Sequence, residues 1–208
     1  MADTLSFVAD PVNREHATSP LAGHYQLGEF GALPEDGEIL TLSERFGLSI
    51  AEVAAWRGSK DTTLAAIAGA TGLTLAPGPG AGAYSEAAAA FNIAPRRWLV
   101  TGNNAALVAR LADSVGESGT VTDLSHGRTI IRIEGKRSRW VLAKIFAVDL
   151  SEDRMEETNG LSTAHHDIFA QIQRVGPDAF DIHVFRSFAR SFWELLRRSA
   201  EEAGYRVV

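Results

Sequence analysis

The sequence repeats a short series of motifs, and this repeat constrains the fold more than any other feature of the chain. The motif Arg57-Gly58-Ser59-Lys60, followed by Leu64-Ala-Ala-Ile67, has a counterpart in Glu134-Gly135-Lys136-Arg137, followed by Val141-Leu-Ala-Lys144. The glycine of each motif predicts the end of a strand, and the apolar residues after it predict a helix. Because repeated motifs mark repeated supersecondary units, we expect two related halves.

A second pair of motifs follows in the same order. Pro95-Arg-Arg-Trp98-Leu-Val100 parallels Pro177-Asp-Ala-Phe180-Asp-Ile182, and both predict a hairpin turn and its second strand. A helical pattern, a glycine (Gly116 or Gly204) and a short strand pattern come next. The first half is expected to contain strands at 38–44, 49–57, 87–93, 98–101 and 120–124, and helices at 60–70 and 103–116. The second half is expected to contain strands at 128–134, 166–175, 179–185 and 205–208, helices at 137–147 and 187–203, and a polar connection at 149–163.

Each half therefore predicts the order β-α-β-β-α-β, which is the ferredoxin-like plan. A four-stranded sheet of this kind carries helices on one face only, so its other face needs a cover, and two copies can cover each other. We expect an α+β protein with a tandem ferredoxin-like (βαββαβ) pseudo-repeat. The halves are expected at 37–125 and 126–208, with the boundary near Ser125-His126-Gly127.

Residues 1–36 predict an extended N-terminal arm. They contain several prolines and glycines and show neither a strand nor a helix period. Scattered apolar residues such as Phe7, Val8, Tyr25 and Phe30 indicate that the arm docks on a surface, because exposed aromatic side chains gain nothing. Two alternatives stay open: the arm packs on its own domain, or it wraps a partner subunit.

The last predicted helix carries an apolar stripe formed by Phe188, Phe192, Leu195 and Leu196 at a spacing of three or four residues. This pattern is typical of a helix packed on a sheet. Trp193 lies beside the stripe and allows a partner contact as the alternative.

Composition excludes several classes of protein. The chain has 20 basic and 26 acidic residues, a formal net charge of −6 and no Cys. Disulfides and thiolate chemistry are therefore absent, and the acidic balance argues against a general nucleic-acid binder. No stretch is long and apolar enough for a membrane helix, and no signal peptide is visible. We expect a soluble cytoplasmic protein.

Three candidate sites for chemistry are weak. Gly78, Gly80 and Gly82 imitate the spacing of a dinucleotide loop, but no strand precedes them and no helix follows. His165-His166-Asp167 places a His and a carboxylate on one face of a predicted strand, without a suitably spaced third metal ligand. Asp123-Leu-Ser125-His126 contains the residue types of a hydrolase triad, but a triad brings together residues from separate elements. We predict no catalytic, cofactor-binding or metal residues in this chain.

A basic run extends over Arg128, Arg132, Lys136, Arg137 and Arg139. It allows either anion or nucleic-acid binding, or ion pairs with another subunit. The net negative charge of the chain disfavours nucleic acid.

Several segments resemble the gamma subunit of heterotetrameric sarcosine oxidase. The longest is Asp123-Leu-Ser-His-Gly-Arg-Thr-Ile-Ile-Arg-Ile-Glu-Gly135, continued by Val141-Leu-Ala-Lys144 and Asp149-Leu150. Phe180-Asp-Ile182 and Phe185-Arg-Ser187-Phe-Ala189, with Trp193 and Leu196, also match. The upstream matches are Ser19-Pro20-Leu21, Arg57-Gly58 and the segment from Pro95 to Leu99. The Ala164-His165-His166 segment and the long arm depart from the pattern and leave the exact N-methyl amine open.

The resemblance implies an aminomethyltransferase-like fold and a noncatalytic subunit that supports assembly. It implies a complex that oxidises sarcosine or a related N-methyl amine and passes the one-carbon unit to tetrahydrofolate. The implied partners are alpha, beta and delta subunits that hold FAD, FMN, NAD and zinc, whereas this chain holds no cofactor.

Two other functions stay as alternatives. A stand-alone folate-binding aminomethyl transferase of the same fold would use Asp123 or Asp149 toward the pterin. An RNA-binding ferredoxin-like module would need exposed aromatic residues on a sheet face, and no such duplicated motif is present.

Overall fold

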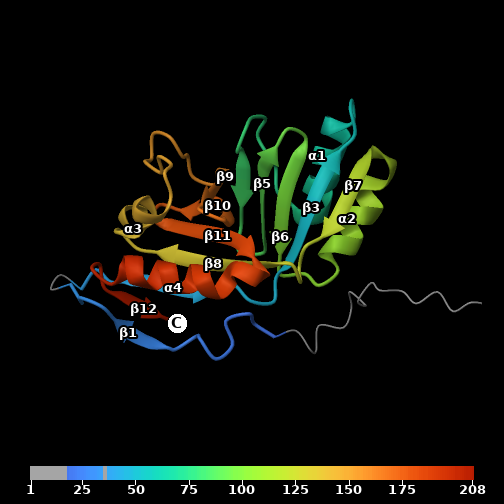
Figure 1. Ribbon diagram of the computed structural model, residues 1–208. Coiled ribbons are helices and arrows are strands. Elements are labelled where there is room, and N and C mark those ends of the chain that lie inside the picture. The colour runs from blue at the N-terminus through green and yellow to red at the C-terminus, as the bar shows by residue number, and fades with distance from the viewer. Residues whose placement is uncertain (1–17, 35–36) are drawn as a thin grey trace, which may run out of the picture.

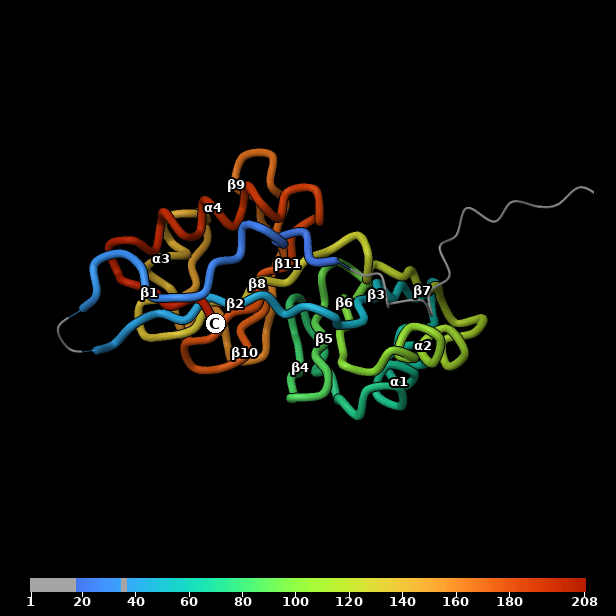
Figure 2. Tube along the Cα trace, turned by 90° about the horizontal axis from the view of Figure 1, so that it is seen from below, coloured from blue at the N-terminus to red at the C-terminus, as the bar shows by residue number. Residues whose placement is uncertain are grey.

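The computed structural model describes residues 18–34 and 37–208 of the chain. Within these ranges the strands form a five-stranded and a seven-stranded sheet, and each sheet has two α-helices on its outer side (Figure 1). The two halves of the molecule lie next to each other, with α1 and α2 at one end and α3 toward the other (Figure 2). This arrangement confirms the predicted α+β class.

The five-stranded sheet has the order β4-β5-β6-β3-β7. Its strands are β3 (Ser49–Ala55), β4 (Gly82–Tyr84), β5 (Ala88–Ala94), β6 (Arg97–Gly102) and β7 (Gly119–Asp123), and its helices are α1 (Lys60–Thr71) and α2 (Leu107–Val115). Without β4, the order β5-β6-β3-β7 is that of a ferredoxin-like unit. Helix α1 ends at Gly72, whose left-handed backbone (φ 76°) favours glycine.

The seven-stranded sheet has the order β1-β12-β2-β8-β11-β10-β9. Its strands are β1 (Gly28–Phe30), β2 (Leu40–Glu44), β8 (Arg128–Glu134), β9 (Gly160–His165), β10 (Ile168–Gly176), β11 (Ala179–Phe185) and β12 (Tyr205–Val207), and its helices are α3 (Ser138–Ile145) and α4 (Ala189–Ala200). Strand β9 begins inside the segment 149–163, where the sequence predicted only a connection, and extends to His165. Its exposed alternate residues gave no continuous apolar signal.

Strand β2 precedes the five-stranded sheet in the sequence but belongs to the other sheet. It runs antiparallel to β8, with Thr41 opposite Glu134, and parallel to β12, with Leu40 opposite Tyr205. Leu40 and Leu42 are buried there. The segment 37–125 therefore supplies one strand to the sheet formed mainly by 126–208.

The described part of the arm, residues 18–34, packs on this chain's own seven-stranded half. Leu21 is fully buried, and the ring of Tyr25 stacks on Trp193 with centroids 5.2 Å apart. Strand β1 pairs with β12, where Phe30 stacks on Tyr205. For residues 18–34, the alternative in which the arm packs on its own domain is therefore confirmed. Phe7 and Val8 lie outside the described residues.

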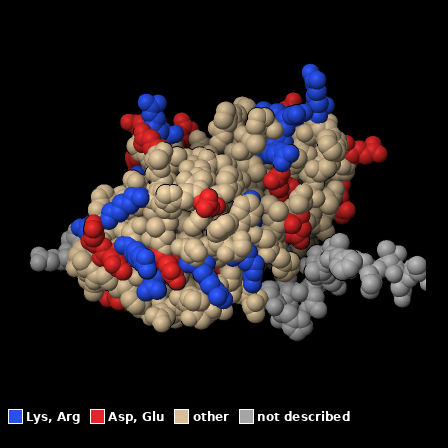
Figure 3. Space-filling model, in the orientation of Figure 1, with Lys and Arg blue, Asp and Glu red and all other residues tan. Residues whose placement is uncertain are grey.

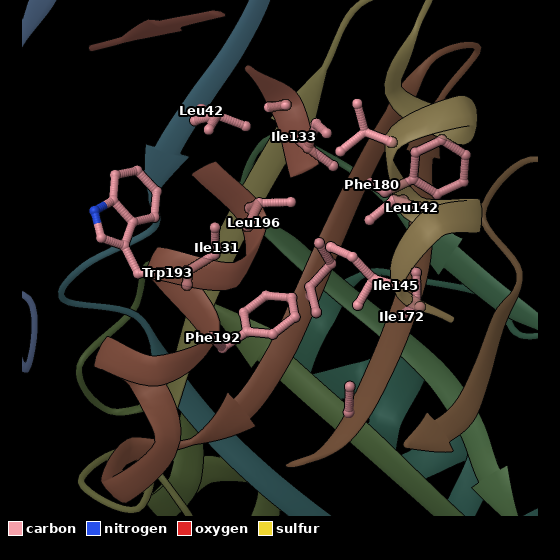
Figure 4. Close-up of a cluster of buried hydrophobic side chains, with 14 of the residues drawn as sticks. Leu42, Ile131, Ile133, Leu142, Ile145, Ile172, Phe180, Phe192, Trp193 and Leu196 are labelled. Carbon is pink, nitrogen blue, oxygen red and sulfur yellow. The ribbon is translucent and has the colours of Figure 1, made fainter. Parts of the chain in front are cut away.

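The larger core lies between the seven-stranded sheet and helices α3 and α4 (Figure 4). Phe192 and Leu196 of α4 lie in this core between Ile131 of β8 on one side and Ile145 of α3 on the other. Phe192 and Leu196 of the predicted apolar stripe thus lie in the core and Leu195 packs against it, whereas Phe188 lies in the turn before α4. Trp193 is 1% exposed, and its Nε1 donates a hydrogen bond to the carbonyl oxygen of His24 at 3.3 Å. The arm therefore covers Trp193.

The start of α4 differs from the prediction. The last helix was predicted to begin at residue 187, but Ser187 lies in a 3-10 turn, Arg186–Phe188, and α4 begins at Ala189 without a side-chain cap. The turn continues directly into the helix, so the helical region begins close to the predicted place although its first turn is 3-10.

Candidate subunit interface and the junction between the sheets

The two sheets meet through their helix-free faces. Ile50, Phe91 and Leu99 of the five-stranded sheet form a small apolar cluster with Ile130 of the seven-stranded sheet. Polar side chains surround this cluster and are the candidates for chemistry, because such groups are seldom buried without a structural or functional reason.

Arg132 and Asp181 form an ion pair at this junction. The Nε atom of Arg132 donates to Oδ1 of Asp181 at 2.6 Å, and its Nη2 atom donates to Oδ2 at 2.8 Å and to the Tyr84 hydroxyl at 3.2 Å. Burial alone lowers the pKa of Arg132, but the hydrogen bonds and charge of Asp181 outweigh burial and raise it. The pair is thus fixed in its charged form within the seven-stranded sheet, and the hydrogen bond from Arg132 to Tyr84 connects it to the five-stranded sheet.

Gln173 and the segment before β9 make the second polar connection. The Gln173 Nε2 atom donates to the carbonyl oxygens of Thr158 (2.8 Å), Ala83 and Ala90 (both 3.2 Å). The Thr158 hydroxyl donates to the carbonyl oxygen of Gly82 at 2.8 Å. These bonds satisfy backbone carbonyl oxygens of β4 and β5, so the side chains of Gln173 and Thr158 have a structural role.

His183 is the buried titratable group of the junction. It is 2% exposed and lies opposite Gln171 on the neighbouring strand. The pKa of His183 is lowered to about 4: burial is the largest cause, the charge of Asp181 acts in the opposite direction, and the charge of Arg128 adds to the lowering. Among the described residues, Nδ1 of His183 and Oε1 of Gln171 have no hydrogen-bond partner. A neutral imidazole closed off from solvent cannot serve an external substrate as a base.

The residues that suggested a metal site do not converge. His165 ends β9, and His166 with Asp167 forms the turn to β10, so His165 and Asp167 do not share a strand face as predicted. The Nδ1 atom of His165 lies 2.7 Å from the carbonyl oxygen of Ile145. In the described ranges, no group of three His, Cys, Asp or Glu residues is placed to bind a metal ion.

The Asp123-Leu-Ser125-His126 segment is a turn that connects the two halves. The backbone N–H of Ser125 donates to Oδ1 of Asp123, and the Ser125 hydroxyl accepts from the N–H of Ile50 at 3.0 Å. Both side chains are engaged with backbone groups, and His126 is exposed. The geometry is that of a turn and not of a triad.

The basic run is largely neutralised within the chain. Lys136 pairs with Glu38, and Arg139 pairs with Asp178 and donates to the carbonyl oxygen of Leu150. Basic and acidic side chains are interspersed over α4 on the face in Figure 3, which shows no continuous basic surface. This distribution is unsuited to a nucleic-acid backbone.

The glycines of the Pro/Gly loop serve the junction and not a nucleotide. Gly80 accepts a hydrogen bond from the N–H of Gly160 at 2.7 Å, and a Cβ at Gly80 would lie 2.3 Å from the Gly160 carbonyl oxygen. The glycine is required because the two backbones approach so closely.

What we call the waist patch consists of three exposed aromatic residues (Phe46, His126 and Phe185) and two partly buried arginines (Arg128 and Arg186). It lies where the arm, β11 and the loop after β2 come together around two adjoining hollows that share Pro20 and Arg186. Phe46 is 51% exposed and Phe185 41%. The Arg128 guanidinium lies 3.8 Å from the centre of the Phe185 ring. Aromatic and Arg side chains of this kind are enriched in protein interfaces.

The arrangement of the two sheets and their helices is similar to that of a known class of protein. A solved structure of the glycine cleavage system aminomethyltransferase T from Bartonella henselae matches with a TM-score of 0.55 and 19% identity, over 82% of this chain and 47% of that chain. This likeness shows the fold, two joined ferredoxin-like halves of the aminomethyltransferase type.

The family is shown by a more specific match. The model of the sarcosine oxidase gamma subunit family matches residues 57–202, and the chain belongs to this family. The solved heterotetrameric sarcosine oxidase from Corynebacterium sp. U-96, in complex with pyrrole 2-carboxylate, contains a chain that matches with a TM-score of 0.76 and 27% identity, over 89% of this chain and 95% of that chain. No curated protein sequence matches significantly. The resemblance inferred from the sequence is confirmed.

Proposed function

We propose that this chain is the noncatalytic gamma subunit of a flavin-dependent heterotetrameric sarcosine oxidase and supports assembly of that complex. The family match over residues 57–202 carries the proposal. The likeness to a heterotetrameric sarcosine oxidase, which covers 95% of the related chain, supports it. Family membership favours this function over a stand-alone folate-binding aminomethyl transferase.

The proposal extends to the rest of the complex. Its partners are alpha, beta and delta subunits, which hold FAD, FMN, NAD, tetrahydrofolate and zinc, and the reaction is oxidative demethylation of sarcosine or a related N-methyl amine. The complex works in the cytoplasm. Among the described residues, no helix has the length and apolar character needed to cross a membrane.

The waist patch is the proposed contact with a larger subunit. Arg128 and Arg186 line it together with exposed aromatic rings, so we expect a partner surface with acidic and apolar residues. At the sheet junction, Arg132, Asp181 and Gln173 are bonded within the chain, and His183 is buried away from the solvent.

The test compares the purified chain with a complex made by coexpression. The chain alone should show no flavin absorbance and no sarcosine oxidation, whereas the coexpressed complex should show both. Bound flavin and turnover by the chain alone would overturn the proposal. Phe185→Asp should reduce recovery of the complex, whereas Trp56→Asp, at an aromatic residue exposed elsewhere on the surface, should leave it unchanged.

A further inference from the structure

A cavity of about 730 Å³ opens beside the junction of the two halves. Its walls come from the start of α1, the loop 76–80, the β5–β6 turn and the segment 154–162. Apolar side chains form much of the lining, among them Trp98 and Met155, which are 2% and 3% exposed. The size falls within the range of small-molecule sites, roughly 300–1,000 Å³.

The charged residues that line the cavity are all basic. Lys60 and Arg96 from the first half and Arg154 from the second half line it, and none of its lining residues is Asp or Glu. No described carboxylate lies within ion-pair distance of these three cations. Arg132, Arg139 and Arg174, in contrast, are each paired with a carboxylate. The cavity is therefore lined by three cations that form no ion pair with a described carboxylate, although the charge of Arg154 helps to lower the pKa of Asp149.

The walls are held in place independently of any ligand. Asn159, which lines the cavity, accepts a hydrogen bond through Oδ1 from the N–H of Gly82 at 3.2 Å. The preceding residue, Thr158, has φ 73°, which is rare for a β-branched residue, and hydrogen bonds to Gly82 and Gln173 fix it there. A frame of this kind lowers the entropy cost of binding, because the walls need not be ordered again.

We propose that this cavity binds a small organic polyanion whose carboxylate or phosphate groups are carried on an apolar scaffold. The cations bind the charged groups, and Trp98, Met155 and the prolines of the loop contact the scaffold. Because Arg154 belongs to a different half from Lys60 and Arg96, the ligand connects the two halves. This site is separate from the waist patch and does not depend on the proposed function.

Calorimetric titration of the full-length chain at fixed ionic strength tests the proposal. The probes are 1-naphthyl phosphate, naphthalene-1,4-dicarboxylate, the neutral 1-naphthalenemethanol and inorganic pyrophosphate. We expect one site for at least one aromatic anion and at least about tenfold weaker binding of the neutral compound and of pyrophosphate. The first two probes distinguish phosphate from carboxylate ligands. Equal binding of the neutral compound, or no binding of either aromatic anion, would overturn the proposal.

Variants at the rim of the cavity test whether the anion binds there. Ala76→Glu places an acid on the exposed rim and should weaken binding at least about tenfold, and Arg96→Gln and Arg154→Gln should each weaken it several-fold. The matched controls Ala105→Glu and Arg57→Gln change exposed residues outside the cavity and should leave affinity unchanged. Equal loss in variant and control would show nonspecific charge attraction and overturn the proposal.

The coexpressed complex supplies the last comparison. The anion should bind there with an affinity similar to that for the chain alone. If assembly removes binding, a partner subunit covers the cavity, and the proposed ligand site is wrong.

Discussion

The two halves share an order of elements along the chain, but β2 separates β12 from β8 in the seven-stranded sheet, whereas β7 lies directly beside β3 in the five-stranded sheet. Their described cores also differ in composition. Trp193, Tyr205, Phe180 and Phe192 contribute large rings to the core of the seven-stranded half. The five-stranded half instead has a core rich in alanine and valine, with Trp98 as its aromatic member. Strand β2 and the arm segment 18–34 add further cover only to the seven-stranded half. A repeated topology therefore does not fix how much apolar surface each copy buries.

Because their cores differ, we expect the two halves to be stabilised mainly by different interactions. Hydrophobic burial scales with the apolar area removed from water, so the seven-stranded half gains more from its own core. The five-stranded half gains relatively more from the polar junction with its neighbour. The following experiments test this comparison, beginning with the largest expected effect.

Trp193→Ala should cause the largest loss, about 4 kcal/mol of unfolding free energy. The substitution leaves a cavity and removes both the stacking partner of Tyr25 and the hydrogen bond to His24. Urea denaturation of the full chain measures the loss. Trp140→Ala is the matched control, because Trp140 is 47% exposed, and it should cost less than about 1 kcal/mol. A similar loss in both variants would contradict the role given to the arm.

Asp181→Ala should cost about 3 kcal/mol, because it leaves Arg132 buried at the junction without its partner. Replacing both residues, as Arg132→Met with Asp181→Leu, removes the uncompensated charge and should recover most of that loss. Denaturation of the two variants under the same conditions makes the comparison. If the double variant is as unstable as the single one, the loss does not come from the unpaired charge.

The pH dependence of stability tests the burial of His183. Its pKa is about 4 in the folded chain, below the usual value of 6.5. The unfolded chain therefore binds more protons between these values, so stability is fully present above pH 6.5 and is lost as the pH falls toward 4. We expect a loss of about 2 kcal/mol between pH 6.5 and 4.5.

The matched variants isolate this contribution. His183→Gln should remove that part of the pH dependence, whereas His126→Gln, at an exposed residue, should retain it. Parallel slopes for the wild-type chain and His183→Gln would show that other groups dominate.

Local sequence signals predicted most helices and strands, because hydrophobic periodicity and turn-forming residues act over short stretches of the chain. Strand β8 has the predicted bounds 128–134, and both hairpins lie at the predicted places. The placement of β2 was not predictable in this way, because pairing with β8 and β12 depends on residues far along the chain. The division of the chain into 1–36, 37–125 and 126–208 stays a prediction.

The candidate sites show the same limit. The sequence identified Arg132 as part of a basic run, but only the fold brings it to Asp181 and Tyr84. The cavity was missed because Lys60, Arg96 and Arg154 lie far apart in the sequence and share no motif. The Pro/Gly loop was the one local signal near it. The prediction that the chain holds no catalytic, cofactor or metal residues stays a prediction.

The smallest expected effect decides whether the halves unfold separately. Ile67→Val and Ile172→Val each remove one buried methyl group, from the five-stranded and the seven-stranded core, and should each cost about 1 kcal/mol. If the five-stranded half opens alone, Ile67→Val should speed amide exchange in α1 and α2 about fivefold, and Ile172→Val should leave those amides unchanged. Equal acceleration by both variants would mean that the polar junction couples the two cores into one unfolding unit, despite their different composition.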